Sequence, residues 1–300
     1  MHSSKVLRFA LALAIAASSA AVSAQILLPS TPKRAFGASI SPAYDGWFNN
    51  TDGTHTFLIG YYNRNWTQEL DIPIGPNNHF EPGDPDRGQP THFYPNRNFG
   101  MFTITVPKNH PPTERLWWVL TVGGITQRVP FHMSAEYNMS PGTASEESPG
   151  GAYNKPALLR FAESGPAAQG PFTTTAKALP RTAKVGAPMT IDMWVEDDAL
   201  YSSGANTPMS ETSKEPMTAL VVGKYRGPGK VEIGKGHKEV TTLKGGKAGQ
   251  PFAGKTSTTA TFDTPGEYML HVTANDLSGP GGGATGCCWT TAILKVTVTP

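Results

Sequence analysis

The stretch that decides the fold is residues 262–276, which read FDTPGEYMLHVTAND. Residues 264–266, Thr-Pro-Gly, have the composition of a tight turn. After this turn, apolar residues occupy every second position: Tyr268, Leu270, Val272 and Ala274. A period of two is that of a β-strand with one buried face. The stretch therefore predicts a turn that leads into a strand packed against a core.

The same order of residues, from Phe262 to Asp276, resembles the closing strands of bacterial exported immunoglobulin-like and polycystic-kidney-disease-type domains. In such domains the tyrosine after the turn bonds back to the backbone, so the resemblance implies this contact for Tyr268. It also implies a β-sandwich in the C-terminal part of the chain. The resemblance implies no activity, because one fold carries many functions.

Similar alternation recurs along the chain, in windows separated by turns rich in glycine and proline. The windows expected to form strands are residues 56–62, 101–106, 115–122, 125–131, 188–196, 217–225, 257–262 and 292–298. With 32 Gly, 27 Pro and no long apolar stripe of helical period, the chain is predicted to be all-β. We expect two immunoglobulin-like β-sandwich domains, residues 39–133 and 171–300, joined by a Pro/Gly/Ser-rich linker over residues 134–170.

The first residues predict export. Lys5 and Arg8 precede an apolar run over residues 9–17, and small residues follow up to Ala24. This pattern is that of a signal peptide cleaved near Ala24, and no later segment has transmembrane length, so we expect a secreted or periplasmic protein. Loss of Lys5 and Arg8 leaves 23 basic residues against 23 acidic ones. A balanced charge argues against nucleic acid as a partner.

The two cysteines, Cys287 and Cys288, are neighbours and the only ones in the chain. In an exported protein we expect a disulfide between them, although consecutive Cα atoms lie closer together than a disulfide prefers. The glycine-rich residues 279–286 supply the freedom to distort the chain. Strand alternation places Cys288 inward and Cys287 outward with Trp289. The pair is either a rigid turn that presents Trp289 or a redox-sensitive surface site, or else a structural turn with no ligand. The absence of a Cys-x-x-Cys motif and of a nearby catalytic histidine favours the structural turn.

The polar loop over residues 75–98 is a candidate metal site. Glu81, Asp84 and Asp86 carry carboxylates of the kind that calcium prefers. The spacing of a calcium loop is absent, however, and Asp-Pro-Asp more often forms a turn. Arg87 provides an alternative partner for a neighbouring carboxylate. The sequence otherwise indicates no cofactor, with calcium at this loop as the one alternative.

Aromatic residues gather in the N-terminal part, where Trp47, Trp66 and Trp117 are candidate binding residues, and Trp289 beside the cysteines is a fourth candidate. Trp117 and Trp118 are adjacent on an expected strand, so they should project to opposite faces. An exposed aromatic platform stacks on sugar rings or docks a protein, whereas core packing is the alternative.

A basic stretch over residues 224–255 holds eight Lys or Arg and two Glu. It suits either an anionic polymer or a solvated strand edge protected by lysines. Nucleophile elbows, paired zinc histidines and phosphate loops are absent from the sequence. We therefore expect an exported, non-catalytic binding or structural module of the cell envelope or extracellular space, with an envelope protein or polysaccharide as partner. The alternatives are a polysaccharide-binding accessory protein that uses the N-terminal aromatics, and a redox or metal-dependent enzyme that uses Cys287 and Cys288 or the 75–98 loop.

Overall fold

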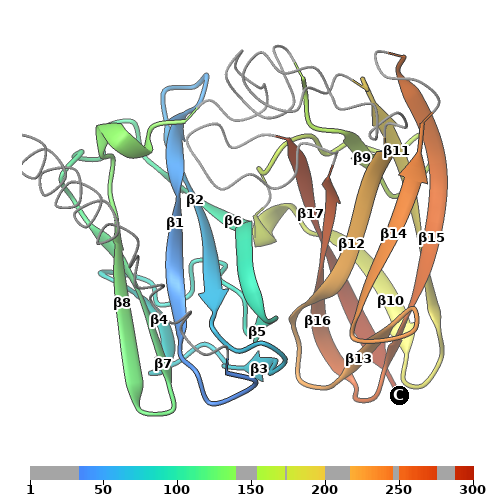
Figure 1. The fold of residues 1–300 in the computed structure, drawn as a ribbon, viewed down its shortest axis with the longest axis horizontal. Coiled ribbons are helices and arrows are strands. Elements are labelled where there is room, and N and C mark those ends of the chain that lie inside the picture. The colour runs from blue at the N-terminus through green and yellow to red at the C-terminus, as the bar shows by residue number, and fades with distance from the viewer. Residues whose placement is uncertain (1–33, 140–153, 173, 200–216, 246–249, 276–287) are drawn as a thin grey trace, which may run out of the picture. The chain divides into compact units, whose positions relative to one another are not determined.

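Strands dominate the computed structural model (Figure 1), which describes residues 34–139, 154–172, 174–199, 217–245, 250–275 and 288–300. The predicted signal peptide and Cys287 lie outside these residues. Within them there are 17 strands, two short 3-10 helices (Ala135–Tyr137 and Thr175–Lys177) and no α-helix. The predicted all-β class is confirmed. None of the described segments forms a helix that is long and apolar enough to cross a membrane.

The N-terminal half contains eight strands in three sheets. They are β1 (Ile40–Asn49), β2 (His55–Asn63), β3 (Leu70–Asp71), β4 (Asn78–Glu81), β5 (His92–Phe93), β6 (Asn96–Val106), β7 (Leu116–Val122) and β8 (Ile125–Phe131). The sheet orders are β1-β2-β6, β4-β7-β8 and β3-β5. Strands β7 and β8 form the predicted hairpin, whose turn residues Gly123 and Gly124 have φ of 56° and 78°. Both values lie in the left-handed region that glycine tolerates best, which explains the glycine pair.

The core of this half is largely aromatic. Phe80 stacks on Trp118 with ring centroids 5.6 Å apart, and Phe102 meets Trp118 edge-on at 5.4 Å. The Trp118 Nε1–H group donates to Asn78 Oδ1 over 2.9 Å, so its buried polar atom is satisfied. Trp117 lies on the opposite face, as predicted, with the Arg128 guanidinium 3.7 Å from its ring centroid.

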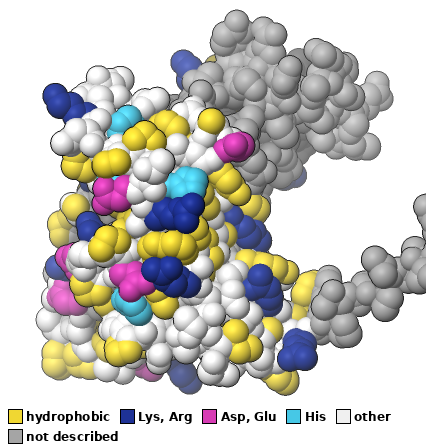
Figure 2. Space-filling view, turned by 90° about the vertical axis from the view of Figure 1, so that its left-hand side faces the viewer, with side chains coloured by type: hydrophobic (Ala, Val, Ile, Leu, Met, Phe, Trp, Pro, Cys, Tyr) yellow, Lys and Arg dark blue, Asp and Glu magenta, His cyan; other side chains and the backbone are white. Residues whose placement is uncertain are grey.

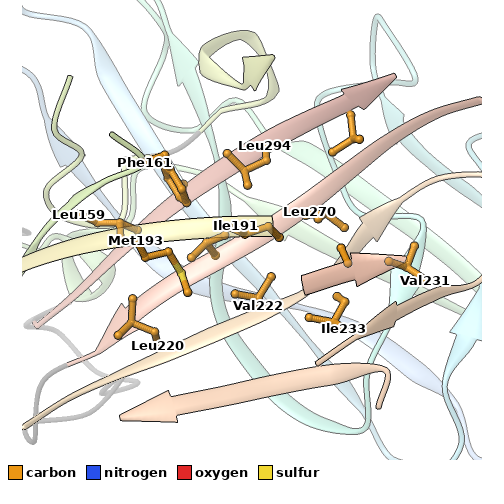
Figure 3. Packing of buried hydrophobic residues seen from close by; sticks show 14 of the residues in the cluster. Leu159, Phe161, Ile191, Met193, Leu220, Val222, Val231, Ile233, Leu270 and Leu294 are labelled. Carbon is orange, nitrogen blue, oxygen red and sulfur yellow. The ribbon is translucent and has the colours of Figure 1, made fainter. Parts of the chain in front are cut away.

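The C-terminal half contains nine strands in two sheets. They are β9 (Leu158–Arg160), β10 (Leu179–Lys184), β11 (Met189–Asp197), β12 (Met217–Arg226), β13 (Val231–Ile233), β14 (Lys238–Lys244), β15 (Phe252–Phe262), β16 (Gly266–Asn275) and β17 (Trp289–Thr299). One sheet has the order β10-β17-β16-β12-β14 and the other β13-β15-β11-β9. Apolar side chains from both sheets meet in one core (Figure 3), which gives the β-sandwich.

Strand β16 shows how this core follows from the sequence. All four alternating residues, Tyr268, Leu270, Val272 and Ala274, are fully buried. The Tyr268 hydroxyl donates to the Thr264 carbonyl over 2.9 Å and accepts from the Gly229 N–H group over 3.0 Å. The backbone contact that the resemblance implied for Tyr268 is thereby confirmed.

The segment expected to be a linker, residues 134–170, contributes to the sandwich. Its strand β9 pairs with β11 and completes the edge of the four-stranded sheet. At its start, the Met139 N–H group donates to the Trp47 carbonyl over 2.9 Å. The C-terminal sandwich thus begins at Leu158 instead of residue 171. Residues 34–300 form one compact unit, so the predicted division into two domains is not confirmed.

Candidate functional site

The 75–98 loop, which is the candidate metal site, forms hydrogen bonds and an ion pair with the end of strand β12. Arg226 donates from both terminal nitrogens to the Asp86 carboxylate, over 2.7 and 2.9 Å. Its Nε also donates to the Gln89 carbonyl over 2.8 Å, and the Thr91 N–H group donates to the Tyr225 carbonyl over 3.1 Å. Burial alone would raise the pKa of Asp86, but Arg226 holds it below its ordinary value. These contacts join the two halves of the chain.

The three predicted metal ligands take part in three separate contacts. Glu81 Oε1 accepts from Arg128 Nε over 2.7 Å, and Asp84 Oδ1 accepts from the Asp86 N–H group over 2.9 Å. Asp86 itself is bound by Arg226. Within the described ranges, no group of three or more His, Cys, Asp or Glu side chains is arranged to hold a metal ion. The structure therefore does not bring Glu81, Asp84 and Asp86 together as one ligand set, and calcium binding by this loop stays a prediction.

A second set of contacts between the halves is formed by Glu69, Asp71, His92, Lys224 and His237, which we call the charge cluster. Lys224 Nζ lies 2.9 Å from Asp71 Oδ1, although the two residues are 153 positions apart. His92 contacts Asp71 Oδ1 at 3.0 Å and Glu69 Oε2 at 3.3 Å, and His237 contacts Glu69 Oε2 at 3.2 Å. Every member therefore faces a side chain of opposite charge when the histidines are protonated.

The ionisation of His92 follows from this environment. Burial lowers the pKa of His92, but the hydrogen bonds to Asp71 and Glu69 outweigh it and raise the pKa above its ordinary value. The pKa values of Glu69 and Asp71 are lowered, because contact with His92 outweighs their own burial. The charge cluster is thus stabilised in its ionised form.

A small cavity of about 150 Å³, which we call the crevice, lies beside the charge cluster. Six side chains matter for its chemistry: Tyr94, Arg97, Lys238, His271, Asn275 and Trp289. The Tyr94 hydroxyl accepts from the Lys224 N–H group over 2.7 Å, and its ring lines the crevice, so the two sites share this residue. Gly223 is required there, because a Cβ at this position would lie 2.9 Å from the Tyr94 ring.

The crevice is lined by three side chains that each carry a buried polar atom without a hydrogen-bond partner. These atoms are His271 Nε2, Asn275 Oδ1 and Trp289 Nε1. Burial, together with the charge of Lys238, lowers the pKa of His271 to about 4, although the Met101 carbonyl acts in the opposite direction. His271 is therefore neutral near pH 7. Three such side chains around one cavity make the crevice the candidate ligand site of the described residues.

The two cations at the crevice differ in availability. Arg97 forms a largely buried ion pair with Asp45, and its NH1 atom donates to the carbonyls of Tyr61 at 3.1 Å and Asn98 at 2.7 Å. The Lys238 ammonium lies 5.1 Å from the centroid of the Tyr94 ring, and burial lowers its pKa. Lys238 is thus the cation that a ligand would meet.

The four tryptophans predicted to bind a ligand do not form one platform. Trp47 donates from Nε1 to the Ser134 carbonyl over 2.7 Å and is partly buried on β1. Trp66 is 52% exposed in the loop after β2, and Trp117 lies beneath Arg128 on β7. On the face drawn in Figure 2, hydrophobic side chains lie among charged ones of both signs.

Trp289 lies in the interior, so the prediction that it is presented on a surface is wrong. Its side chain is 1% exposed and packs with Phe48, Leu58 and Met139. Gly100 of β6 lies against the indole ring, where a Cβ would come within 2.6 Å. Strand alternation correctly predicted that Trp289 points away from the core of the C-terminal sandwich. The outer face of β17, on which it lies, is covered by the N-terminal half.

Cys288 is fully buried, and its Sγ atom lies 3.6 Å from the Asn154 carbonyl. Because Cys287 lies outside the described residues, the disulfide between them stays a prediction. The basic stretch over residues 224–255 is partly internal, since Lys224 and Arg226 hold the two halves together.

Sequence reasoning missed both the charge cluster and the crevice. One signal was present: Lys224 interrupts an apolar run, ALVVGKY, over residues 219–225. A charged residue inside such a strand is seldom buried unless it has a partner. His271 and Asn275 gave no comparable signal, because polar residues are expected on the outer face of a strand.

No family model matches the sequence, and no curated protein matches it. Among solved structures, the chain is similar to the ASH / PapD-like domain of human CEP192, with 12% identity and a TM-score of 0.25 over 56% of this chain and 96% of that domain. Domains 4 and 5 of the S-layer protein SbsC give 11% identity and a TM-score of 0.23, over 88% and 98% of the two chains. A protein of unknown function from Porphyromonas gingivalis W83 gives 8% and 0.22, over 87% and 100%. Similarity at this level carries no information about function.

Proposed function

We propose that this chain is an exported, non-catalytic binding module whose ligand site is the crevice. The observation that carries the proposal is the set of three buried polar atoms without partners, on His271, Asn275 and Trp289, around one cavity. The neighbouring charge cluster differs from the crevice in that each of its side chains lies against a partner of opposite charge. A signal peptide cleaved near Ala24 would place the module in the periplasm or outside the cell.

The chemistry of the lining favours binding over catalysis. The described lining residues include one histidine, His271, and no carboxylate. A general base works best with a pKa near the operating pH, whereas burial lowers the pKa of His271 to about 4. An acid/base pair is therefore not offered by this lining.

The proposal is tested by a nuclear magnetic resonance screen of the full mature chain against small neutral, anionic and cationic polar compounds. We expect at least one class to shift the indole N–H signal of Trp289 in a saturable way, and to lose this effect in His271→Phe. If no compound perturbs this signal at millimolar concentration, the crevice is not a ligand site and the proposal fails.

A second candidate function is polysaccharide binding through the N-terminal aromatics, and the 52% exposure of Trp66 favours it. Sedimentation with insoluble polysaccharides tests this function. It requires that Trp66→Ala or Trp117→Ala weaken binding, with Trp47→Ala as a further probe. Equal binding by wild type and all three variants would exclude it.

The disulfide between Cys287 and Cys288 is a separate proposal. Iodoacetamide labelling of the unfolded protein, read by intact mass, should add no label without reductant and two labels with it. Labelling without reductant would show that the pair is not oxidised.

A further inference from the structure

A second cavity, which we call the apolar pocket, has a volume of about 370 Å³. It is lined by residues of β9, β10 and β17 and of the loops between β9 and β10. Among them, Leu159, Phe161 and Ile293 are buried, and the first two belong to the core of the sandwich (Figure 3). Pro166 and Ala167 are exposed. The pocket is therefore open to solvent and has an apolar interior.

The walls of the apolar pocket are fixed by backbone hydrogen bonds. Leu159 and Ala168 donate to each other's carbonyls over 2.9 and 2.8 Å. The Thr291 N–H group donates to the Gly170 carbonyl over 3.2 Å. Gly170 has a φ of 81°, and a Cβ there would lie 2.3 Å from the Phe172 ring, so glycine lets this ring form one wall. A pocket fixed in this way exists before a ligand enters, as is usual for sites that bind small molecules.

The apolar pocket carries a single charge. Lys177 is the one charged side chain among its described lining residues, which include no carboxylate. It is exposed at the end of the 3-10 helix Thr175–Lys177, and its ammonium group forms no ion pair within the described part of the chain. One unpaired cation beside an apolar interior favours a ligand with an apolar body and an anionic end.

The surroundings of Lys177 suit the polar end of such a ligand. A polar cavity of about 900 Å³ adjoins the apolar pocket, and the two share Phe172 and Lys177. Asparagine and threonine side chains form most of its lining. Asp52 is the one acidic side chain among its described lining residues, and its Oδ1 atom accepts from the Thr54 N–H group and hydroxyl over 2.9 and 2.7 Å. An end group bound by Lys177 would thus lie at a polar cavity while the rest of the ligand stays in the apolar pocket.

The volume of the apolar pocket sets the size of the apolar body. An engineered cavity of about 150 Å³ holds one benzene molecule, which has six carbons. By the same ratio, the 370 Å³ of the apolar pocket would enclose roughly a dozen carbons. An alkyl chain suits this lining, because it needs no hydrogen bonds and adapts its shape to the aliphatic and aromatic side chains.

We propose that the apolar pocket binds a single-chain anionic amphiphile of the fatty-acid class, with its carboxylate paired to Lys177. This inference goes beyond the proposed function, because it concerns a different cavity from the crevice. An ammonium end group would lie beside the Lys177 cation without a carboxylate to pair with. A hydroxyl end group would lack the charge that Lys177 attracts.

The test is a titration of the full mature chain with decanoate, decanol and decylamine at pH 7, followed by the methyl NMR signals of Leu179 and Ile293. These compounds share one chain length and differ in the end group. We expect decanoate to bind about threefold more tightly than decanol, which is the size of an exposed ion pair, and decylamine to bind most weakly. Octanoate should bind about tenfold more weakly than decanoate, since two fewer CH₂ groups are buried.

Two results of this titration would overturn the inference. One is binding of decanol or decylamine that equals or exceeds that of decanoate. The other is the absence of saturable shifts with decanoate at millimolar concentration, which is also the result expected if another segment of this chain fills the pocket.

Variants identify the apolar pocket as the place of binding. Lys177→Gln should remove the preference for decanoate over decanol and leave decanol binding unchanged. Lys184→Gln is the matched control, because Lys184 is an exposed lysine of β10 outside the lining, and it should keep the preference. Leu179→Asp places negative charge in the pocket and should weaken decanoate more than tenfold.

A thermal melt establishes that each variant is folded. If Leu179→Asp does not fold, Ala167→Trp at the exposed rim serves instead, because the larger side chain fills the pocket. An unchanged preference in Lys177→Gln would overturn the role of the lysine. Unchanged decanoate binding in a folded variant of Leu179 or Ala167 would overturn the assignment of the site.

Discussion

The charge cluster and the crevice lie side by side and share Tyr94. They differ in whether their buried polar side chains have partners. In the charge cluster, Lys224 and His92 both face the Asp71 carboxylate within 3.0 Å. In the crevice, His271 and two other side chains each keep a buried polar atom without a partner. Paired charges hold the two halves together, although His92 Nε2 contacts Glu69 Oε2 at 3.3 Å without a well-aligned hydrogen bond. The unpaired atoms at the crevice are the basis on which we propose it as the binding site.

The largest expected effect is a difference in pH dependence between the two histidines. The pKa of His271 falls from its ordinary value of 6.5 to about 4, so the unfolded chain takes up a proton first. Its contribution to stability is full above pH 6.5 and is lost as the pH falls toward 4, by up to about 3 kcal/mol. The pKa of His92 is raised, so its contribution is full below pH 6.5 and is lost as the pH rises through the raised value.

Urea unfolding from pH 4.5 to 8 measures this difference. His271→Gln should flatten the loss of stability below pH 6.5, and His92→Gln should flatten the loss above it. The charges of Lys238, Glu69 and Asp71 stay in both variants, so wild type minus variant isolates each histidine. If both substitutions change the free energy of unfolding on the same side of pH 6.5, the pKa values of the two histidines are not shifted in opposite directions.

The next effect concerns the carboxylate that the charge cluster shares. Asp71→Ala leaves the buried Lys224 ammonium without its partner. Removal of one partner of a buried pair costs 3–5 kcal/mol, but the Asp71 side chain is 57% exposed and water can replace part of the contact. We expect a loss of about 2 kcal/mol in the free energy of unfolding. Asp192→Ala is the control, since its contact with Lys255 is exposed on both sides and should cost less than about 1 kcal/mol. Equal losses would show that Lys224 does not depend on Asp71.

The contrast between the two sites also shows what local sequence determines. The burial of β16 was predictable because strand alternation acts over a few residues. The Tyr268 contact was implied by the resemblance to immunoglobulin-like domains. The charge cluster was not predictable, because Lys224 and Asp71 are separated by 153 positions. The contact of Asp86 with Arg226 was not predictable for the same reason, since the two residues are 140 positions apart. Strand periodicity predicts that the Trp289 side chain points away from the core of the C-terminal sandwich. It does not predict which other element covers this side chain.

Two buried tryptophans give a smaller but closely matched comparison. Trp118 donates from Nε1 to Asn78 Oδ1, whereas Trp289 Nε1 has no partner. Trp118→Phe therefore leaves a buried acceptor unsatisfied, and Trp289→Phe removes an atom that was unsatisfied already. Both substitutions also lose packing, so the hydrogen bond appears as the difference between them, about 1 kcal/mol more for Trp118→Phe. Chemical denaturation at pH 7 without ligand measures it, and a larger loss in Trp289→Phe would mean that its N–H group is bonded in solution.

The smallest expected effect separates an ion pair from a metal site in the 75–98 loop. Glu81 and Arg128 are 43% and 47% exposed, so Glu81→Gln should change stability by less than about 0.5 kcal/mol. Calcium should leave the unfolding temperature unchanged, because binding would first have to displace Arg226 from Asp86. A true site at fifty times its Kd would instead add about 2 kcal/mol, which a thermal melt would resolve. A rise in unfolding temperature with calcium that disappears in Asp86→Asn would support the metal prediction and would mean that calcium displaces Arg226 from Asp86.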